Sequence, residues 1–250
     1  MKFDFKAKVV FITGAASGIG YAQAEAFLKQ GATVFAMDRK EGALTDLKNT
    51  YGNKFDYARG SVREKMDVEA AVSQAIEQHE RIDILLHTAG VLDDYRKTLE
   101  TDETLWDLVM DTNVKGMYYV TNAVLPQMLK QKKGVVVNMA SIAGFVAGGG
   151  GAAYTASKHA IIGYTKQLDY DYARDGIRAN ALAPGAIQTP MNKKDFEGDG
   201  KMAKWVAEET PAGRWANPEE VANLTLFIAS DAADYIHGSV IPIDGGWTMK

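Results

Sequence analysis

Short runs of apolar residues alternate along this chain with longer stretches in which apolar residues recur at helical spacing. Runs such as Val9–Ile12 and Val135–Val137 have no polar face, which is typical of strands buried on both sides in a parallel sheet. Strands are predicted at Val9–Thr13, Thr33–Asp38, Lys54–Arg59, Ile82–His87, Val135–Ala140, Arg178–Ala183 and Ser239–Ile243. Helices are predicted at Gly18–Gln30, Glu41–Asn49, Asp67–His79, Asp102–Leu129, Ala152–Arg174 and Pro218–Ser230.

This alternation predicts a single α/β domain over residues 1–250, built as a doubly wound parallel sheet of about seven strands with helices on both faces. No shift in composition marks a second domain. The one unusual segment, Thr189–Lys204, is polar, mixed in charge and contains Gly198 and Gly200. We expect this segment to be a mobile substrate lid that is helical in part.

Composition narrows the possible functions without naming one. The chain has a formal net charge of −4 and no cysteine, so disulfides, thiolate catalysis and cysteine metal sites are excluded. The negative charge argues against nucleic acid, no apolar stretch approaches the ~20 residues that span a bilayer, and the N-terminus lacks the apolar run of a signal peptide. The four histidines show no metal-ligand spacing. We expect a cytoplasmic protein that binds no metal, nucleic acid or membrane.

A glycine-rich turn follows the first predicted strand and opens into the first predicted helix. Its residues Gly14, Ser17, Gly18, Ile19 and Gly20 offer bare backbone for a tight turn, and the helix N-terminus attracts a diphosphate. A glycine triplet alone is a weak signal, but this strand-turn-helix context favours a dinucleotide site over a plain βα turn. A nucleoside-triphosphate loop is excluded, because no Lys-Ser or Lys-Thr pair follows the glycines.

Asp38 ends the second predicted strand, 24 residues after Gly14. A carboxylate at this place accepts hydrogen bonds from the adenosine ribose and repels a 2′-phosphate, which favours NAD over NADP. Arg39 points the other way, because an arginine beside the ribose tolerates a phosphate. The alternative that Asp38 only caps a turn stays open.

Tyr154 and Lys158 are four residues apart in a predicted helix and therefore lie on one face, one turn apart. An ammonium beside a phenol stabilises the phenolate, so we expect Lys158 to lower the pKa of Tyr154 toward the working pH. Ser141 ends the fifth predicted strand, at the sheet edge where ligands bind, and can orient a substrate oxygen. Such Tyr-Lys pairs are common by chance, but the serine and the glycine loop favour catalysis.

These motifs together resemble the short-chain dehydrogenase/reductase family over about Lys8–Trp247, nearly the whole chain. The resemblance implies a Rossmann-type fold and hydride transfer between a nicotinamide cofactor and a secondary alcohol or ketone, with Tyr154 as proton donor and acceptor. It implies that Lys158 also binds the nicotinamide ribose. It further implies a fourth catalytic residue, Asn113, which holds a water in a proton relay from the lysine.

The resemblance also extends the expected cofactor site along the chain. Family motifs place around the cofactor Ser61, Val62, Ala89, Gly90, Pro184, Gly185, Ile187 and Thr189, together with Tyr154 and Lys158. Two positions depart from the family pattern, since His87-Thr88 replaces a usual pair of asparagines and Ser61 a usual aspartate. We expect His87 to be a packed structural residue and Ser61 to bind adenine more weakly than a carboxylate would.

The leading hypothesis is an NAD(P)-dependent oxidoreductase that resembles 3-oxoacyl-[acyl-carrier-protein] reductases. Because Asp38 disfavours NADPH, an NAD-dependent polyol, sugar or hydroxy-acid dehydrogenase is a serious alternative. A hypothesis of another class is a non-catalytic NAD-sensing regulator, against which the intact Asn113, Ser141, Tyr154 and Lys158 set argues. The resemblance also implies a homo-oligomer, with a tetramer favoured. The substrate walls, expected at Val91–Arg96, Phe145–Ala152 and the lid, carry no readable code.

Overall fold

Seven parallel strands form one sheet in the order β3-β2-β1-β4-β5-β6-β7. The computed structural model describes residues 3–249. The strands are β1 (Val9–Thr13), β2 (Thr33–Asp38), β3 (Phe55–Arg59), β4 (Ile84–His87), β5 (Gly134–Met139), β6 (Ile177–Pro184) and β7 (Val240–Ile243). The direction of winding reverses between β1 and β4, and in doubly wound sheets a ligand crevice lies at such a point.

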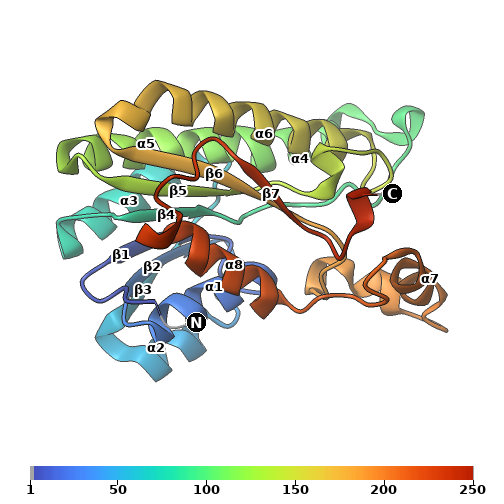
Figure 1. The fold of residues 1–250 in the computed structure, drawn as a ribbon, viewed down its shortest axis with the longest axis horizontal. Coiled ribbons are helices and arrows are strands. Elements are labelled where there is room, and N and C mark those ends of the chain that lie inside the picture. The colour runs from blue at the N-terminus through green and yellow to red at the C-terminus, as the bar shows by residue number, and fades with distance from the viewer. Residues whose placement is uncertain (1–2, 250) are drawn as a thin grey trace.

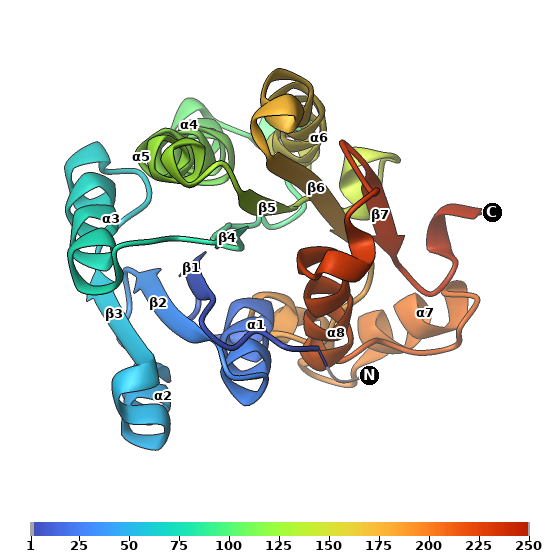
Figure 2. The same ribbon diagram turned by 60° about the vertical axis from the view of Figure 1, so that its left-hand side comes forward.

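Helices cover both faces of the sheet (Figures 1 and 2). On one face lie α1 (Gly18–Lys29), α2 (Leu44–Tyr51) and α8 (Pro218–Ala229), and on the other α3 (Lys65–His79), α4 (Glu103–Met110), α5 (Gly116–Gln131) and α6 (Ala152–Tyr172). Successive residues of a strand point to opposite faces of the sheet and pack in two separate hydrophobic cores. Ile12 packs in one core with Phe27 of α1, and Phe11 packs in the other with Val124 of α5. This explains why the strands lack a polar face, and the predicted fold class is confirmed.

The helix predicted over Asp102–Leu129 is not regular throughout. α4 and α5 are joined by a π-helical turn, Asp111–Lys115, which contains Asn113. Such turns insert a residue into the helical ladder and are frequent at functional sites. Smaller differences lie at element ends; α2 begins at Leu44 rather than Glu41, because Gly42 has a φ of +43° that a helix does not accommodate.

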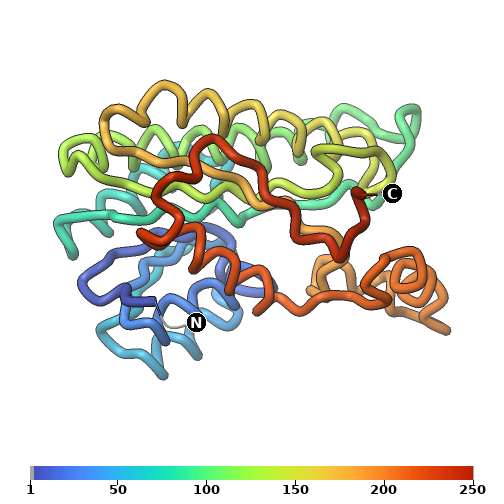
Figure 3. The backbone as a smooth tube through the Cα atoms, viewed as in Figure 1, coloured from blue at the N-terminus to red at the C-terminus, as the bar shows by residue number. Residues whose placement is uncertain are grey.

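The lid lies in the long connection between the end of β6 and the start of α8, which projects away from the sheet, as the tube in Figure 3 shows. Pro190–Phe196 form a 3-10 helix and Lys201–Glu209 form α7, so the segment is helical in part, as expected. Trp215 anchors it, because its indole N–H donates to the carbonyl of Ala203 over 2.9 Å. In the described part of the chain, no helix is long and apolar enough to cross a membrane.

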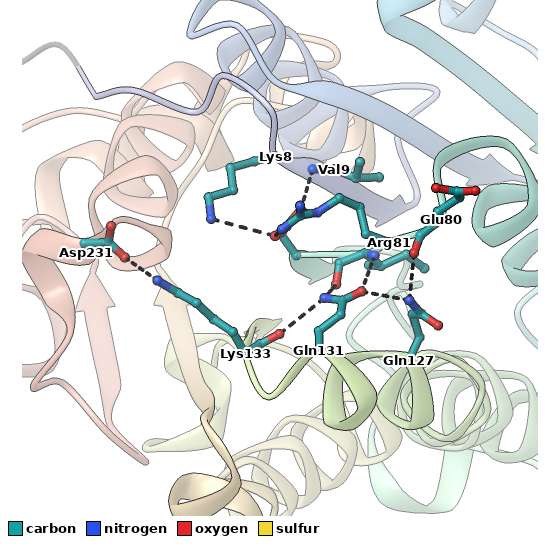
Figure 4. Close-up of polar contacts among 10 residues, drawn as sticks. Lys8, Val9, Glu80, Arg81, Gln127, Gln131, Lys133 and Asp231 are labelled. Atoms are coloured by element: carbon teal, nitrogen blue, oxygen red, sulfur yellow. Dashed lines mark hydrogen bonds and ion pairs between the residues drawn. The ribbon is translucent and has the colours of Figure 1, made fainter.

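The amino ends of the strands are held by polar contacts (Figure 4). The buried carboxylate of Asp83 accepts the backbone N–H of Val9 over 2.9 Å and the Nε–H of Arg81 over 2.9 Å. Gln131 of α5 accepts the N–H of Ile82 over 3.0 Å and donates to its carbonyl over 2.9 Å. These contacts tie β1, β4 and α5 together, so this edge of the sheet is structural.

Candidate active site

A cavity of about 660 Å³ opens at the carboxyl ends of the strands. Its lining includes every residue predicted to bind the cofactor: Gly14, Ser17, Gly18, Ile19, Gly20, Asp38, Ser61, Val62, Ala89, Gly90, Tyr154, Lys158, Pro184, Gly185, Ile187 and Thr189. Ser141 also lines the cavity, whereas Asn113 does not. The folded chain therefore brings together residues from seven separate segments, at the place where the winding reverses.

The glycine loop leaves no room for side chains. A Cβ on Gly20 would lie 2.1 Å from the carbonyl oxygen of Gly14, and Gly14 itself has a φ of +75°, which favours glycine. No side chain caps the N-terminus of α1, where Ser17 is the N-cap residue. The amides of this helix end can thus receive an anion, and the loop fits the diphosphate of a dinucleotide.

The carboxylate of Asp38 is tied to the backbone around it. It accepts the N–H of Ala16 over 3.0 Å with one oxygen and that of Lys40 over 3.0 Å with the other. Asp38 therefore does cap the turns on either side of it, which was the alternative interpretation of this residue. A carboxylate has about four acceptor positions, so Asp38 keeps capacity for the hydroxyls of a ribose. Arg39 lines the same end of the cavity.

Three of the four expected catalytic residues, Ser141, Tyr154 and Lys158, line the cavity together. The hydroxyl of Ser141 lies close enough to that of Tyr154 to lower the pKa of the phenol. Ser141 is the N-cap of a short 3-10 helix and accepts the N–H of Ala143 over 3.2 Å, which fixes its orientation. Lys158 lies one turn along α6, with its Nζ 5.2 Å from the centre of the Tyr154 ring. That amine donates to the carbonyl of Met139 over 2.7 Å.

Burial sets the protonation of this pair in a direction that differs from the expectation. Burial raises the pKa of Tyr154 to about 12, while the hydrogen bond from Ser141 lowers it and Tyr95 and Asp93 raise it further. Burial also lowers the pKa of Lys158 to about 7. Desolvation disfavours both charged forms, so Lys158 is partly neutral near pH 7 and the predicted acidification of Tyr154 is absent in the protein by itself.

Asn113 lies behind the cavity rather than in it. Its Nδ2 donates to the carbonyl of Val91 over 3.0 Å and to Ser157 over 3.1 Å, and its Oδ1 accepts the N–H of Val91 over 2.8 Å. Asn113, in the π-helical turn, thus links the segment after β4 to α6. One acceptor position on Oδ1 stays available.

His87 is buried and its Nε2 lies 2.9 Å from the hydroxyl of Thr121. Burial lowers the pKa of His87 to about 3, so the ring is neutral at physiological pH. These contacts agree with the structural role expected for it. Among residues 3–249, no group of three His, Asp or Glu residues could hold a metal ion.

Sequence reasoning missed several residues at the site. Asp93 is fully buried and accepts the backbone N–H groups of Gly151 and Tyr154. Tyr95 lies within the wall predicted at Val91–Arg96, but nothing marked it out from its neighbours. Trp205 and Trp247 also line the cavity, although both lie outside the predicted walls.

The fold and the site define a nicotinamide-dependent oxidoreductase: a parallel sheet with a dinucleotide loop, and a tyrosine, serine and lysine gathered at the crevice. The family model described as Enoyl-(Acyl carrier protein) reductase matches residues 14–248. The chain accordingly belongs to the short-chain dehydrogenase/reductase family, whose members interconvert secondary alcohols and ketones with NAD or NADP.

Relatives of different names resemble the chain over nearly its whole length. It is 40% identical to 3beta-hydroxysteroid dehydrogenase 2 of Eggerthella lenta, over 95% of this chain and 93% of that protein. It is also 40% identical to the 3-oxoacyl-[acyl-carrier-protein] reductase FabG of Thermotoga maritima, over 96% and 97% of the two chains. A solved gluconate 5-dehydrogenase from Burkholderia cenocepacia, in complex with NADP and tartrate, superposes with a TM-score of 0.93 at 31% identity, covering 100% and 98%.

Proposed function

We propose that this protein is an active ketone reductase and secondary-alcohol dehydrogenase in which Tyr154 transfers the proton. The observation that carries the proposal is that Ser141, Tyr154 and Lys158 line one cavity together with the glycine loop, where the Ser141 hydroxyl acts on the Tyr154 phenol and lowers its pKa. A nicotinamide bound there supplies or accepts the hydride. Two neighbouring hydroxyl groups in one cavity can hold a carbonyl oxygen between two donors.

Each side chain has a separate task in this proposal. Ser141, held by Ala143, orients the substrate oxygen. Tyr154 keeps its proton at neutral pH, because burial raises its pKa, and gives it to the oxygen that becomes an alkoxide during reduction. Lys158 would hold the ribose beside the nicotinamide, and its ammonium form favours the phenolate needed for oxidation. Asn113 supports this arrangement through Val91 and Ser157, with an acceptor position for a relay water.

We propose NAD rather than NADP as the preferred cofactor. Asp38 places a carboxylate at the adenosine end of the cavity, where it would accept from a ribose and repel a 2′-phosphate. The contacts of Asp38 with Ala16 and Lys40 hold that charge in place. Arg39 opposes the preference in part.

The names of the relatives suggest three classes of substrate, namely a 3-oxoacyl thioester, a hydroxysteroid or a hydroxy acid such as gluconate. A non-catalytic NAD sensor is disfavoured, since a binding module needs no Tyr154–Ser141 pair. We propose that the Thr189–Lys204 segment is a mobile lid, because the ion pair of Lys194 with Asp94, over 2.8 Å, links it to the segment after β4 through exposed side chains. An exposed ion pair of this kind is weak and can open.

We also propose that the protein works as a cytoplasmic homo-oligomer, with a tetramer favoured. Trp106 of α4 and Tyr118 of α5 are large and exposed, and exposed aromatic residues are enriched at interfaces. Light scattering coupled to gel filtration measures the mass, and a monomer at micromolar concentration would contradict this assembly.

The test of the activity is a comparison of the wild type with Tyr154→Phe. NADH consumption is followed with a panel of ketones and thioesters, and NADH binding is measured separately by calorimetry. We expect Tyr154→Phe to lose turnover by a factor of about 100 or more while it keeps NADH binding. Tyr170→Phe is the matched control, since Tyr170 is 83% exposed on α6. Tight NADH binding with no turnover by the wild type would favour the sensor instead.

A further inference from the structure

The substrate end of the cavity has an apolar wall. The lining includes Tyr95 and five large apolar side chains from the lid, α7 and the end of the chain, namely Met191, Met202, Trp205, Val206 and Trp247. Three of the four tryptophans of the chain line this one cavity. Trp205 and Trp247 lie edge to face with ring centres 6.4 Å apart.

Four of these side chains, Tyr95, Met191, Met202 and Trp205, are exposed to solvent although they line a cavity. Trp205 is 52% exposed and Met202 is 54% exposed. Exposed apolar side chains that gather in a hollow mark a place where a ligand is buried. A ligand that covers this apolar surface removes it from water, which favours binding, so the wall favours an apolar ligand.

Charge at this end of the cavity excludes one class of ligand. The cations in the lining, apart from Lys158, are Arg39, Lys40 and Arg63, which follow β2 and β3 at the adenosine end. The ionisable carboxyl group beside the apolar wall is Asp195. An anionic substrate would lose its hydration there and meet a carboxyl group instead of a cation.

We propose that the site takes an uncharged secondary alcohol or ketone on an apolar ring system, which packs against Trp205 and Trp247. This proposal rests on the proposed function and narrows its substrate. In the reduction, hydride adds two electrons to the carbonyl carbon, Tyr154 gives a proton to the oxygen, and the nicotinamide is oxidised. The apolar body of the substrate takes no part in the bond changes and binds only to the wall.

The test compares three ketones as substrates of the NADH-loaded enzyme: the bicyclic 2-decalone, the small 2-butanone and the anionic acetoacetate. We expect kcat/KM for 2-decalone to exceed that for acetoacetate by about 100-fold. Trp205→Ala should lower kcat/KM for 2-decalone about tenfold or more and leave that for 2-butanone within about threefold. Tyr235→Ala is the control for loss of an exposed aromatic side chain, because Tyr235 is 100% exposed and does not line the cavity.

A better rate with acetoacetate, or an equal loss for all ketones in Trp205→Ala, overturns the substrate class and leaves the proposed function intact. If no ketone is reduced, the proposed function fails by itself. The substrate class is then decided by binding, because saturation-transfer NMR should detect 2-decalone on the wild type and a weaker signal on Trp205→Ala. Equal signals on both proteins would contradict it.

A second, independent observation concerns the beginning of the catalytic helix. Its N-cap residue, Gly151, has no side chain, and the first turn of α6 contains no acidic residue. Asp93, from the segment after β4, takes the place of a cap: its two oxygens accept the N–H groups of Gly151 and of Tyr154, each over 2.8 Å. Asp93 is fully buried, so the carboxylate faces the positive end of the helix away from water.

The surrounding backbone leaves this arrangement little freedom. The N–H of Ala152 donates to the carbonyl of Arg96 over 3.2 Å, and the N–H of Arg96 donates to the carbonyl of Asp93 over 3.2 Å. A Cβ on Gly151 would lie 2.4 Å from the carbonyl oxygen of Arg96. The position of the Tyr154 backbone is therefore fixed by its hydrogen bond to Asp93 as well as by the helix.

We infer that Asp93 is a positioning residue for Tyr154, which sets both the place of the phenol and the negative field around it. This inference also rests on the proposed function. Burial is the main cause of the raised pKa of Tyr154, and Tyr95 and Asp93 add to it. Loss of the Asp93 charge should therefore make the phenol more acidic, an effect that a scaffold role would not produce.

The test is Asp93→Asn, with Asp102→Asn as a matched control, because Asp102 caps α4 by accepting the N–H of Leu105 over 2.8 Å. The pH profile of alcohol oxidation is measured for both. We expect Asp93→Asn to lower kcat about tenfold or more and to move the rising limb of its profile to lower pH. Asp102→Asn should keep the wild-type profile. An unshifted profile in correctly folded Asp93→Asn refutes the inference, while Tyr154→Phe tests the proposed function separately.

Discussion

The Nζ of Lys158 lies 5.2 Å from the centre of the Tyr154 ring and donates to the carbonyl of Met139 rather than to the phenol. Lys158 therefore acts on Tyr154 through space. With burial raising the pKa of Tyr154 to about 12 and lowering that of Lys158 to about 7, the proton stays on the phenol at neutral pH. A hydroxyl in this state is ready to protonate an alkoxide.

The first prediction is that the two directions of the reaction respond oppositely to pH. Oxidation needs the phenolate, whose fraction rises about tenfold per pH unit below its pKa, so kcat/KM for the alcohol should increase from pH 6 to pH 9. Reduction needs the protonated phenol and should not increase over that range. Initial rates in both directions measure this, and an oxidation rate that falls with pH would be incompatible with Tyr154 as the base.

The second prediction concerns the cofactor. Asp38→Asn removes the charge that disfavours a 2′-phosphate and weakens the acceptor for the ribose, so NADH should bind about tenfold more weakly and NADPH more tightly. Asp56→Asn on β3 is the control, because Asp56 pairs with Lys48 over 3.4 Å and does not line the cavity. Calorimetry with both cofactors gives the ratio. An unchanged ratio of the two affinities would show that Asp38 serves only as a cap.

The third prediction compares two glycines. In Gly20→Ala the new Cβ would lie 2.1 Å from the carbonyl of Gly14, so the dinucleotide loop must shift, which should cost about 1–3 kcal/mol in the free energy of unfolding and most of the NADH affinity. Gly163→Ala meets no heavy atom within 4 Å in the middle of α6 and should stabilise the protein by about 0.5–1 kcal/mol. Urea unfolding and NADH titration of both variants check this; equal behaviour would contradict the tight loop.

The fourth prediction is a loss of stability in acid caused by His87. Its pKa is about 3 in the folded protein against 6.5 for a free histidine, so the unfolded chain binds the proton first. The stabilisation is complete above pH 6.5 and is lost as the pH falls toward 3, by about 2 kcal/mol at pH 5. His87→Gln, which keeps a polar partner for Thr121, should lose about 2 kcal/mol less than the wild type between pH 7 and pH 5.

Urea unfolding at the two pH values measures that difference. Burial also lowers the pKa of His79, but this contribution is the same in both proteins and cancels. His159→Gln is the control, because His159 is exposed on α6. A His87→Gln protein as sensitive to acid as the wild type would mean that His87 is not the group responsible.

Local patterns were enough for much of this protein. Continuous apolar runs predicted the strands, because a strand buried on both faces has no place for a polar residue. The glycine loop was predicted for a similar reason: a positive φ at Gly14 and a clash at Gly20 are decided by neighbours a few residues away. Tyr154 and Lys158 were paired by helical spacing alone. These features depend on short-range geometry, which the order of residues contains directly.

The tertiary structure decided what depends on distant neighbours and on water. Asp93 meets the N–H of Tyr154 across a separation of 61 residues, and the wall formed by Tyr95, Trp205 and Trp247 comes from three remote segments. The pKa of Tyr154 moved opposite to the expectation, because desolvation by the folded chain acts on the phenol more strongly than an ammonium that burial itself makes less basic. Sequence spacing determined which groups are neighbours on one helix, and folding determined how much water each of them keeps.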